Sequence, residues 1–341
     1  MEAFDVGRSN ANSSRRGRAA LPDAIAYLKR YRPLVDDWHA FSEAICRPLA
    51  PCVWSNPARL GATGLARLLA EEGVDACPVP GLPGAFTLED GYRPGRHWWF
   101  CSGLAHAQEV VSQVPVNLLD LTPGQRVLDL CAAPGGKSAQ IAFALENRGT
   151  LVTNDFSTAR IKALQGNLDR LGVVNATTTC WDASNWPAQA GQFDRILLDA
   201  PCSSEGTMRR NPELVGRLGP QLSERLGARQ RAMLRKAVQR CRPGGRILYS
   251  TCTFAPEENE FVVEDILKEN GGRLSLVAVR PKGLFTLPGV VRWDGRNLGA
   301  ELARCIRIWP HHNDTGGFFM AVLEKDSATA AEPDPQPAAL I

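Results

Sequence analysis

The pattern of apolar and polar residues becomes regular after about Val110. From there, short apolar runs alternate with segments in which apolar residues recur at helical spacing. The runs predict strands at 126–130, 151–154, 176–180, 193–198 and 246–250, with later strands near 275–279, 305–309 and 318–323. The spaced segments predict helices from Ser138, over 157–171, over 221–240 and from Pro256, a residue suited to a first helical turn. This alternation is typical of a doubly wound, largely parallel sheet.

The residues before Val110 follow a different pattern. Apolar residues between Ile25 and Phe41 are spaced roughly as in a helix, and residues 51–95 are rich in Pro and Gly with short apolar runs. We therefore expect a small α+β module over 21–110 and a main domain over 111–325. The polar segment 1–20 and the Ala-, Pro- and acid-rich segment 326–341 are expected to be disordered tails.

The composition of the 341 residues, 44% hydrophobic and 22% charged, is that of a soluble globular protein. No apolar run approaches the roughly eighteen residues of a membrane helix, and the first residues lack the apolar core of a secretory signal. We expect a cytoplasmic monomer without a bound metal. The ten cysteines are scattered without C-x-x-C spacing, which favours free thiols over disulfides.

Charge is distributed unevenly along the chain. The formal net charge is only +3, but residues 209–246 hold eleven Lys or Arg against two acids, Glu213 and Glu224. Such an excess would attract a phosphate backbone. A solvated helical face explains it equally well.

The segment Val127–Lys137 (V-L-D-L-C-A-A-P-G-G-K) reads as a buried strand, a Gly-rich turn and the start of a helix. This geometry presents backbone N–H groups and a helix N-terminus to a ligand. The turn matches neither G-x-G-x-x-G nor the phosphate-binding G-x-x-x-x-G-K-[ST], so both of those sites lose their main support. The residues expected at the ligand are Cys131, Ala132, Ala133, Pro134, Gly135, Gly136 and Lys137.

Three aspartates follow successive predicted strands: Asp155, Asp182 and Asp199. The carboxyl ends of parallel strands share one edge of the sheet, where ligands bind. Asp155 is placed to bind ribose hydroxyls and Asp182 to accept from an adenine amino group. An acid-lined pocket suits the cationic S-adenosylmethionine better than a pyrophosphate. Any one of these aspartates could instead be a helix cap or turn residue.

Two cysteines stand just past predicted strands, Cys202 in L-L-D-A-P-C-S-S and Cys252 in Y-S-T-C-T. Together with other motifs they resemble the RsmB/RsmF-type (Nop/Sun) RNA cytosine-5 methyltransferases, in particular the RsmF-like branch without the C-terminal RNA-binding domain. The resemblance covers about 103–325. Its motifs are G-L-A-H-A-Q-E at 103–109, D-L-C-A-A-P-G-G-K at 129–137, N-D at 154–155 with Arg160 downstream, D-A-P-C-S at 199–203, R-P-G-G at 242–245, P-E-E-N-E at 256–260 and G-G-F-F-M-A at 316–321.

The resemblance implies an α/β fold of the class I S-adenosylmethionine-dependent methyltransferases, Rossmann-like, with a seven-stranded, mostly parallel sheet. It also implies that Cys252 attacks C6 of cytosine, which makes C5 electron-rich enough to take the methyl group. Cys202 would assist release of the methylated base, Asp199 would face N3, and Lys137 would supply positive charge that favours the thiolate. In the alternative assignment Cys202 attacks, as the Pro-Cys cysteine does in DNA cytosine-5 methyltransferases; the Y-S-T-C-T match argues against it.

The substrate implied by the resemblance is RNA, ribosomal RNA before transfer RNA, in a single-stranded or looped form that lets a cytosine unstack. Arg209 and Arg210 are the expected RNA contacts, and residues 21–110 the RNA-positioning module, although C-V-W-S-N-P-A-R at 52–59 departs from the family pattern there. His311 and His312 are compatible with a site role or a surface turn. The competing hypotheses are an inactive RNA-binding ribosome-assembly factor and a nicotinamide dehydrogenase, which lacks its glycine motif here.

Overall fold

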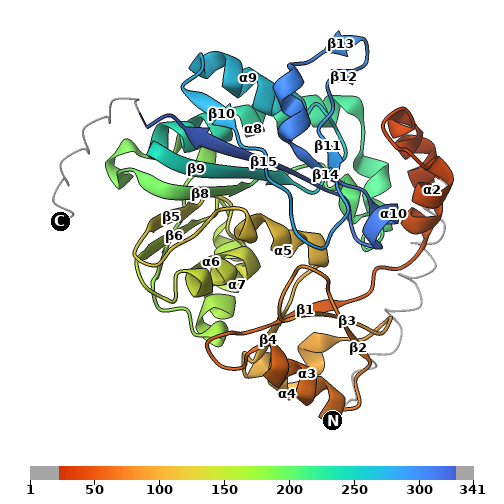
Figure 1. Ribbon diagram of the computed structural model, residues 1–341, viewed down its shortest axis with the longest axis vertical. Coiled ribbons are helices and arrows are strands. Elements are labelled where there is room, and N and C mark those ends of the chain that lie inside the picture. Colours follow the sequence, from red (N-terminus) through yellow and green to blue (C-terminus); the bar gives the residue numbers. More distant parts are fainter. Residues whose placement is uncertain (1–22, 328–341) are drawn as a thin grey trace, which may run out of the picture.

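The computed structural model describes residues 23–327. The tail predicted at 1–20, and all but two residues of the tail predicted at 326–341, lie outside the described residues. Within them the chain builds one large sheet with helices on both faces and one small antiparallel sheet (Figure 1). The small sheet lies beside the helices that cover one face of the large sheet.

The large sheet contains nine strands among residues 23–327, in the order β11-β14-β15-β9-β8-β5-β6-β7, with β10 paired to β15. Strands β7, β6, β5, β8 and β9 run parallel, whereas β15 runs antiparallel to both β9 and β14. The predicted doubly wound, mostly parallel sheet is therefore confirmed, and its seven-stranded core gains the short edge strands β10 and β11. The strands are β5 (Arg126–Asp129), β6 (Thr150–Asn154), β7 (Ala176–Thr179), β8 (Phe193–Asp199), β9 (Cys241–Thr251), β10 (Leu274–Leu276), β11 (Leu287–Pro288), β14 (Ile306–Ile308) and β15 (Phe318–Lys325).

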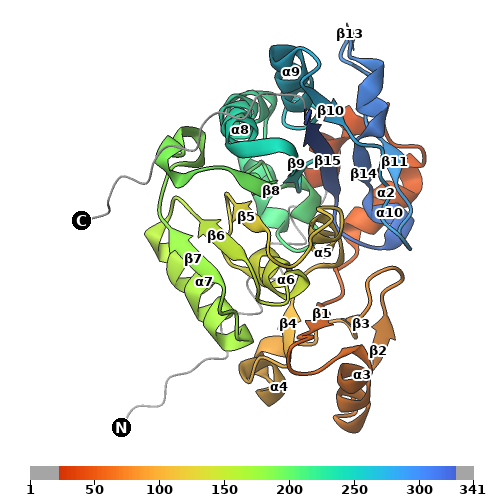
Figure 2. The same ribbon diagram turned by 60° about the vertical axis from the view of Figure 1, so that its left-hand side comes forward.

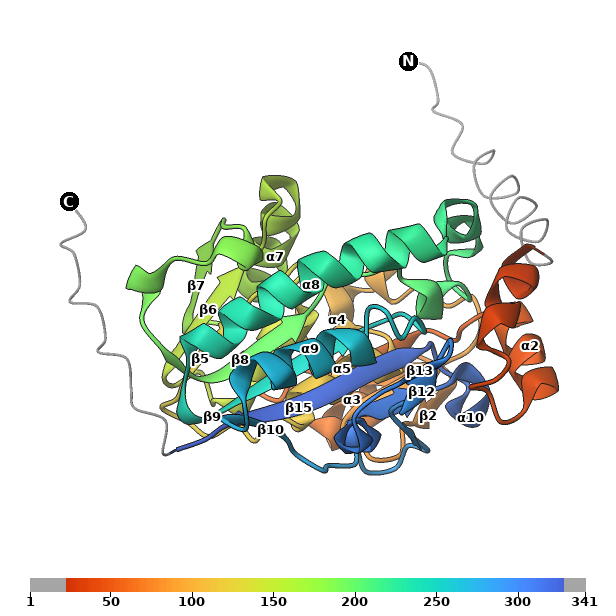
Figure 3. The same cartoon turned by 90° about the horizontal axis from the view of Figure 1, so that it is seen from above.

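Helices bury both faces of this sheet, which is why its central strands are nearly continuous apolar runs. Ile196, Leu197 and Leu198 of β8 are all fully buried. Figures 2 and 3 show α8 and α9 on one face and α5, α6 and α7 on the other. These helices are α5 (Val110–Asn117), α6 (Gly136–Ala144), α7 (Thr158–Leu171), α8 (Pro220–Arg240) and α9 (Glu260–Asn270).

Two boundaries differ from the sequence prediction by four residues or more. Strand β9 begins at Cys241, so the R-P-G-G motif lies inside it, and helix α9 begins at Glu260 instead of Pro256. The side chain of Asn259 explains the later start, because it accepts from Thr251 Oγ1 (2.5 Å) and donates to the Thr253 carbonyl (3.0 Å). These bonds hold the segment 256–259 as a turn against the end of β9.

The small sheet has the order β2-β3-β1-β4, entirely antiparallel. Val53, Leu65 and Trp99 form its buried core with neighbouring apolar residues. Its elements are β1 (Cys52–Ser55), α3 (Ala62–Glu71), β2 (Ala76–Pro78), β3 (Ala85–Leu88), α4 (Trp98–Cys101) and β4 (Ala105–Ala107). A separate hairpin in the main domain consists of two strands of two residues each, β12 (Arg292–Trp293) and β13 (Arg296–Asn297).

Residues 24–46 do not join the small sheet. Tyr31 and Phe41, the latter in α2 (Trp38–Cys46), pack against Phe254, Trp293 and Trp309 of the main domain. Phe254 and Trp309 stack with ring centroids 5.0 Å apart. Residues 24–46 thus pack on an aromatic patch of the main domain, apart from the core of the small sheet.

Two compositional expectations can be compared directly with the described residues. All ten cysteines fall within 23–327 and are free thiols, as predicted. In the same range, every helix is too short or too polar to cross a bilayer.

A buried ion pair joins β14 to α9 and gives a test of the packing. Arg307 Nη2 lies 2.6 Å from Glu260 Oε2, and both side chains are almost fully buried. Replacing Arg307 by Ala leaves a buried carboxylate unpaired, so the free energy of unfolding should fall by about 3 kcal/mol. Arg235→Ala, which breaks the exposed pair with Glu269, should cost less than about 1 kcal/mol. Urea unfolding measures both, and equal losses would contradict this packing.

Candidate active site

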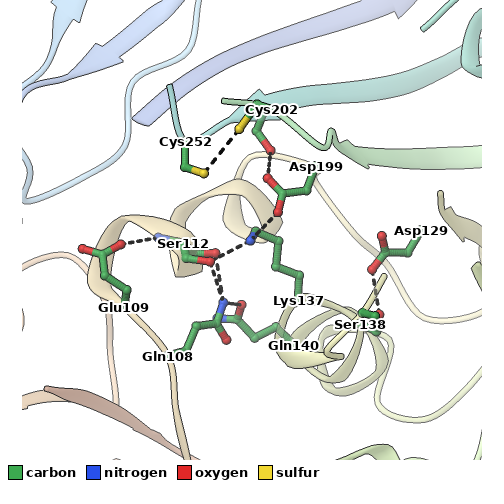
Figure 4. Close-up of polar contacts among 12 residues, drawn as sticks. Gln108, Glu109, Ser112, Asp129, Lys137, Ser138, Gln140, Asp199, Cys202 and Cys252 are labelled. Atoms are coloured by element: carbon green, nitrogen blue, oxygen red, sulfur yellow. Dashed lines mark hydrogen bonds and ion pairs between the residues drawn. The ribbon is translucent and has the colours of Figure 1, made fainter. Parts of the chain in front are cut away.

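The parallel pairing of β8 and β9 places the two motif cysteines together. Asp199, the last residue of β8, pairs with Ser250 near the end of β9, so the loops that follow start side by side. Cys202 and Cys252 stand in these loops with their Sγ atoms 3.4 Å apart (Figure 4). The two sulfurs are therefore within hydrogen-bond distance.

The hydrogen bond divides the two thiols into a donor and an acceptor. Donation from Cys202 lowers the pKa of Cys252, against burial, which raises it. The same bond, together with burial, raises the pKa of Cys202 well above its usual range. Burial also raises the pKa of Cys131, so this nearby sulfur stays a thiol. If one of the two thiols ionises, the thiolate is thus favoured on Cys252. The thiolate is the more reactive form of cysteine.

Lys137 and Asp199 form a fixed pair in front of the sulfurs. Lys137 Nζ, from the first turn of α6, lies 2.8 Å from Asp199 Oδ2 and 2.6 Å from Ser112 Oγ of α5. Ser250 Oγ donates to the other oxygen of Asp199 at 2.7 Å. Hydrogen bonds from α6 and β9 therefore fix the position of this carboxylate, and α5 in turn holds Lys137 (Figure 4).

The Gly-rich turn between β5 and α6 is held by Asp155 and Arg160. Ala133 N–H donates to Asp155 Oδ2 at 3.3 Å, and Arg160 bonds both that oxygen (3.2 Å) and the Ala133 carbonyl (2.5 Å). Gly135 has a φ of +108°, and a Cβ there would lie 3.0 Å from Leu164 Cδ1. Only glycine adopts this conformation without strain.

A cavity of about 300 Å³ opens between the turn and the cysteines. The expected site residues that line it are Cys131, Ala132, Ala133, Pro134, Gly136, Lys137, Asp199, Arg210 and Cys252. Those that do not line it are Gly135, Asp155, Arg160, Asp182, Cys202 and Arg209. Asp182 instead accepts from the amide and hydroxyl of Ser184, which lowers its pKa.

The comparison with known families can now be set beside this geometry. The profile of the family described as 16S rRNA methyltransferase RsmB/F matches residues 116–324. The chain belongs to this family. The family predicted from the motifs is thereby confirmed.

Curated relatives of this RsmB/F-family chain include ribosomal RNA small subunit methyltransferase F of Shigella dysenteriae serotype 1, 34% identical over 324 residues that make up 93% of this chain and 66% of the relative. The protein of the same name from Escherichia coli O139:H28 is 33% identical over the same shares. The chain thus spans about two thirds of the length of these relatives.

Solved structures support the fold. A methyltransferase homolog protein from Pyrococcus horikoshii superposes with a TM-score of 0.78 at 28% identity, covering 90% of this chain and 99% of its own. NSun6 from Pyrococcus horikoshii with SFG gives 0.75 at 22% identity, covering 89% and 97%. The expected Rossmann-like methyltransferase fold is therefore confirmed.

Asp129 is a site residue of this family member that sequence reasoning missed. It ends β5 and lines the cavity, where burial raises the pKa of its carboxyl to about 7 despite a 2.7 Å hydrogen bond from Ser138 Oγ. Its Oδ1 is buried without a hydrogen-bond partner among the described residues. The aspartate in V-L-D-L marks the end of the strand. The strand was predicted from the sequence to continue through Leu130, which placed Asp129 inside the strand and not at the sheet edge where ligands bind.

Arg209 is not available to RNA, contrary to the sequence prediction. Its guanidinium is almost fully buried and bonds the carbonyls of Arg47, Pro48 and Thr315 and the carboxylate of Asp314. Its burial and these four bonds keep the guanidinium from facing a phosphate at the surface. Arg210, the next residue, is exposed and borders the cavity.

Ion pairs neutralise part of the basic stretch 209–246. At least five of its eleven Lys and Arg residues pair with acids outside the stretch: Arg209 with Asp314, Arg231 with Asp265, Arg235 with Glu269, Arg242 with Asp194 and Arg246 with Glu324. These pairs reduce the positive charge that the stretch offers to a phosphate backbone.

His311 and His312 lie in the short helix α10 (Pro310–Asn313), outside the lining of the cavity. Both imidazoles are nearly buried and bond the carboxylate of Asp36, just before α2. Burial disfavours the ionised form of Asp36, but these two hydrogen bonds outweigh it and lower its pKa to about 2. The two histidines connect residues 24–46 to the main domain instead of forming a free surface turn.

The division between the two thiols can be tested by alkylation. In Cys202→Ala the pKa of Cys252 should rise, because its hydrogen-bond donor is lost, and the rise of its iodoacetamide reaction rate with pH should move to higher pH. Mass mapping of each cysteine gives the rates, with exposed Cys77 as the internal reference. An unchanged profile for Cys252 would refute the assigned donor.

Proposed function

We propose that this chain methylates C5 of a cytosine in RNA, through a transient bond between Cys252 Sγ and C6 of the base. The observation that carries the proposal is the thiol pair at 3.4 Å, beside the Lys137–Asp199 pair and next to the Gly-rich turn. Membership of the RsmB/F family supports the part of this proposal that makes the chain an rRNA methyltransferase. The relatives are named for small-subunit ribosomal RNA, so we propose this RNA as the substrate. The cytoplasmic location and the monomeric state stay expectations from the sequence.

The residues divide the reaction between them. Cys252 thiolate adds to C6, so electron density passes to C5, while Asp199 stabilises the base at N3 and Lys137 compensates the negative charge. S-adenosylmethionine, when bound, supplies an electrophilic methyl group. A base then removes the C5 proton, the C6–S bond breaks, and Cys202 assists this release so that Cys252 regains its thiolate. The base that takes the proton is left unassigned.

The cavity suits this cationic cofactor. The unpartnered Asp129 Oδ1 offers an acceptor to its ammonium group, and the amides of Gly136 and Lys137 at the start of α6 offer donors to its carboxylate. Asp155, fixed at the end of β6, remains the candidate for the ribose and Asp182 for the adenine. Asp199 is already committed to Lys137 and Ser250, so we assign it to the target base.

RNA would reach the cavity past Arg210. This exposed side chain is placed to contact the phosphate of a cytosine that has left its stack. We propose that the small sheet and residues 24–46 position the RNA, in keeping with the role expected for 21–110.

The two cysteines should differ when each is replaced. Cys252→Ala should abolish methylation and the covalent RNA complex, because no thiolate reaches C6. Cys202→Ala should leave the enzyme bonded to RNA, since release is impaired. Denaturing gels of protein incubated with cofactor and small-subunit RNA measure both, with Cys77→Ala as the matched control. Trapping by the Cys252 variant would reverse the assignment, and cofactor binding without methylation of any RNA would favour the inactive assembly factor.

Cofactor affinity should depend on pH through Asp129. The pKa of this carboxyl is about 7 in the free protein, and a bound cation favours its ionised form. Binding of S-adenosylmethionine should therefore weaken as pH falls through about 7, where Asp129 takes up a proton. Isothermal titration at several pH values measures this dependence. Asp129→Asn should bind weakly with little dependence on pH, and a variant with the wild-type pH profile would contradict the role of Asp129.

A further inference from the structure

A buried carboxylate lies directly behind the two cysteine loops. Glu205, in the 3₁₀ turn η5 (Glu205–Thr207), follows Cys202 by three residues and is fully buried. Nothing in the proposed reaction uses it, although it stands next to the reacting sulfurs in the chain. A buried ionised group persists only where hydrogen bonds replace its lost hydration.

Four donors surround Glu205, divided between its two oxygens. Oε1 accepts from the hydroxyls of Tyr27 (2.7 Å) and Tyr31 (2.9 Å). Oε2 accepts from Thr253 Oγ1 (3.0 Å) and from the amide of Phe254 (3.1 Å). One carboxylate therefore joins the loop of Cys202 to the two residues that follow Cys252, and joins both loops to the N-terminal segment.

Further bonds show that the two loops form one unit. Gly206 N–H donates to the carbonyl of Cys252 at 2.8 Å. The hydroxyls of Ser203 and Thr253 lie 2.7 Å apart. Among these contacts, Glu205 is the one that also reaches residues 24–46, the segment that packs on the aromatic patch around Phe254.

We propose that Glu205 is a positioning residue for the thiol pair, which holds the Cys252 loop against the Cys202 loop and makes their separation depend on the docking of residues 24–46. The effect on the thiol pair stands by itself, whereas its consequence for methylation rests on the proposed function. Glu205→Gln removes the negative charge and replaces one acceptor oxygen by an amide donor. Two of the four bonds then lose their acceptor unless the hydroxyls reverse direction, and the other two lose their charge assistance, so the contact weakens. The sulfurs then lose their fixed separation.

A neighbouring acid supplies a matched control. Glu257 also holds residues 24–46, through Arg30 (2.5 Å), and it accepts from Trp293 Nε1 (3.0 Å). Neither partner belongs to a cysteine loop. Glu257→Gln therefore weakens the same docking without removing a bond from the segments 202–206 or 252–254.

The experiment measures how readily the two sulfurs meet. Diamide oxidises two thiols to a disulfide, taking up the two electrons and two protons that they lose, and mass mapping of the full-length protein follows the bond between Cys202 and Cys252. Formation should be about tenfold slower in Glu205→Gln, because small displacements of reacting atoms cost large factors in rate. Glu257→Gln weakens the docking but keeps all four bonds of Glu205, so it should slow disulfide formation much less than Glu205→Gln does. Equal rates in all three proteins, or equal slowing in both variants, would overturn the proposal.

A milder variant keeps the proposal testable should Glu205→Gln not fold. Tyr27→Phe with Tyr31→Phe removes the donors to Oε1 and leaves those to Oε2 in place. Disulfide formation should slow in this variant too, and an unchanged rate would refute the dependence on residues 24–46. In methylation assays the same variants should lower kcat by a larger factor than they raise KM for RNA. A wild type that methylates no RNA would refute the proposed function, yet the thiol measurement would still decide the role of Glu205.

Discussion

The hydrogen bond between Cys202 and Cys252 is the contact on which the rest of the site depends. It exists because β8 and β9 are parallel neighbours that end at the same level, so the loops after them start together. The bond favours the thiolate on Cys252 and keeps Cys202 protonated. Two residues of the same type thereby differ in their protonation, which is the basis for proposing Cys252 as the nucleophile and Cys202 as its proton-bearing partner.

Three aspartates stand at the carboxyl ends of neighbouring parallel strands near the thiol pair. Asp129 lines the cavity, Asp155 holds the Gly-rich turn through Ala133, and Asp199 is fixed by Lys137 on the side of the sulfurs. Burial of such groups is costly without partners, which is why each holds hydrogen bonds from a neighbouring element. Asp129 Oδ1 has no hydrogen-bond donor among the described residues, so a bound ligand would supply the donor at this atom.

Local patterns in the sequence predicted what depends on neighbours along the chain. The strands, the turn at 131–137 and the position of both cysteines past strand ends followed from apolar runs and motifs. Properties that depend on distant partners could not be predicted this way: the burial of Arg209 by Asp314 and three carbonyls, and the late start of α9 through Asn259. The docking of residues 24–46 could not be predicted for the same reason. The aromatic patch that receives them is assembled from Phe254, Trp293 and Trp309, which lie more than 200 residues further along the chain.

The central claim is that Cys252 forms the bond to the base, and the most direct measurement identifies the cysteine that carries it. RNA that contains 5-fluorocytidine cannot lose a proton from C5 after methyl transfer, so the protein should remain attached. Digestion with protease and nuclease followed by mass spectrometry then locates the nucleotide on one peptide. The account predicts a methylated fluorocytidine on Cys252. Attachment to Cys202, or no attachment with a bound cofactor, would contradict it.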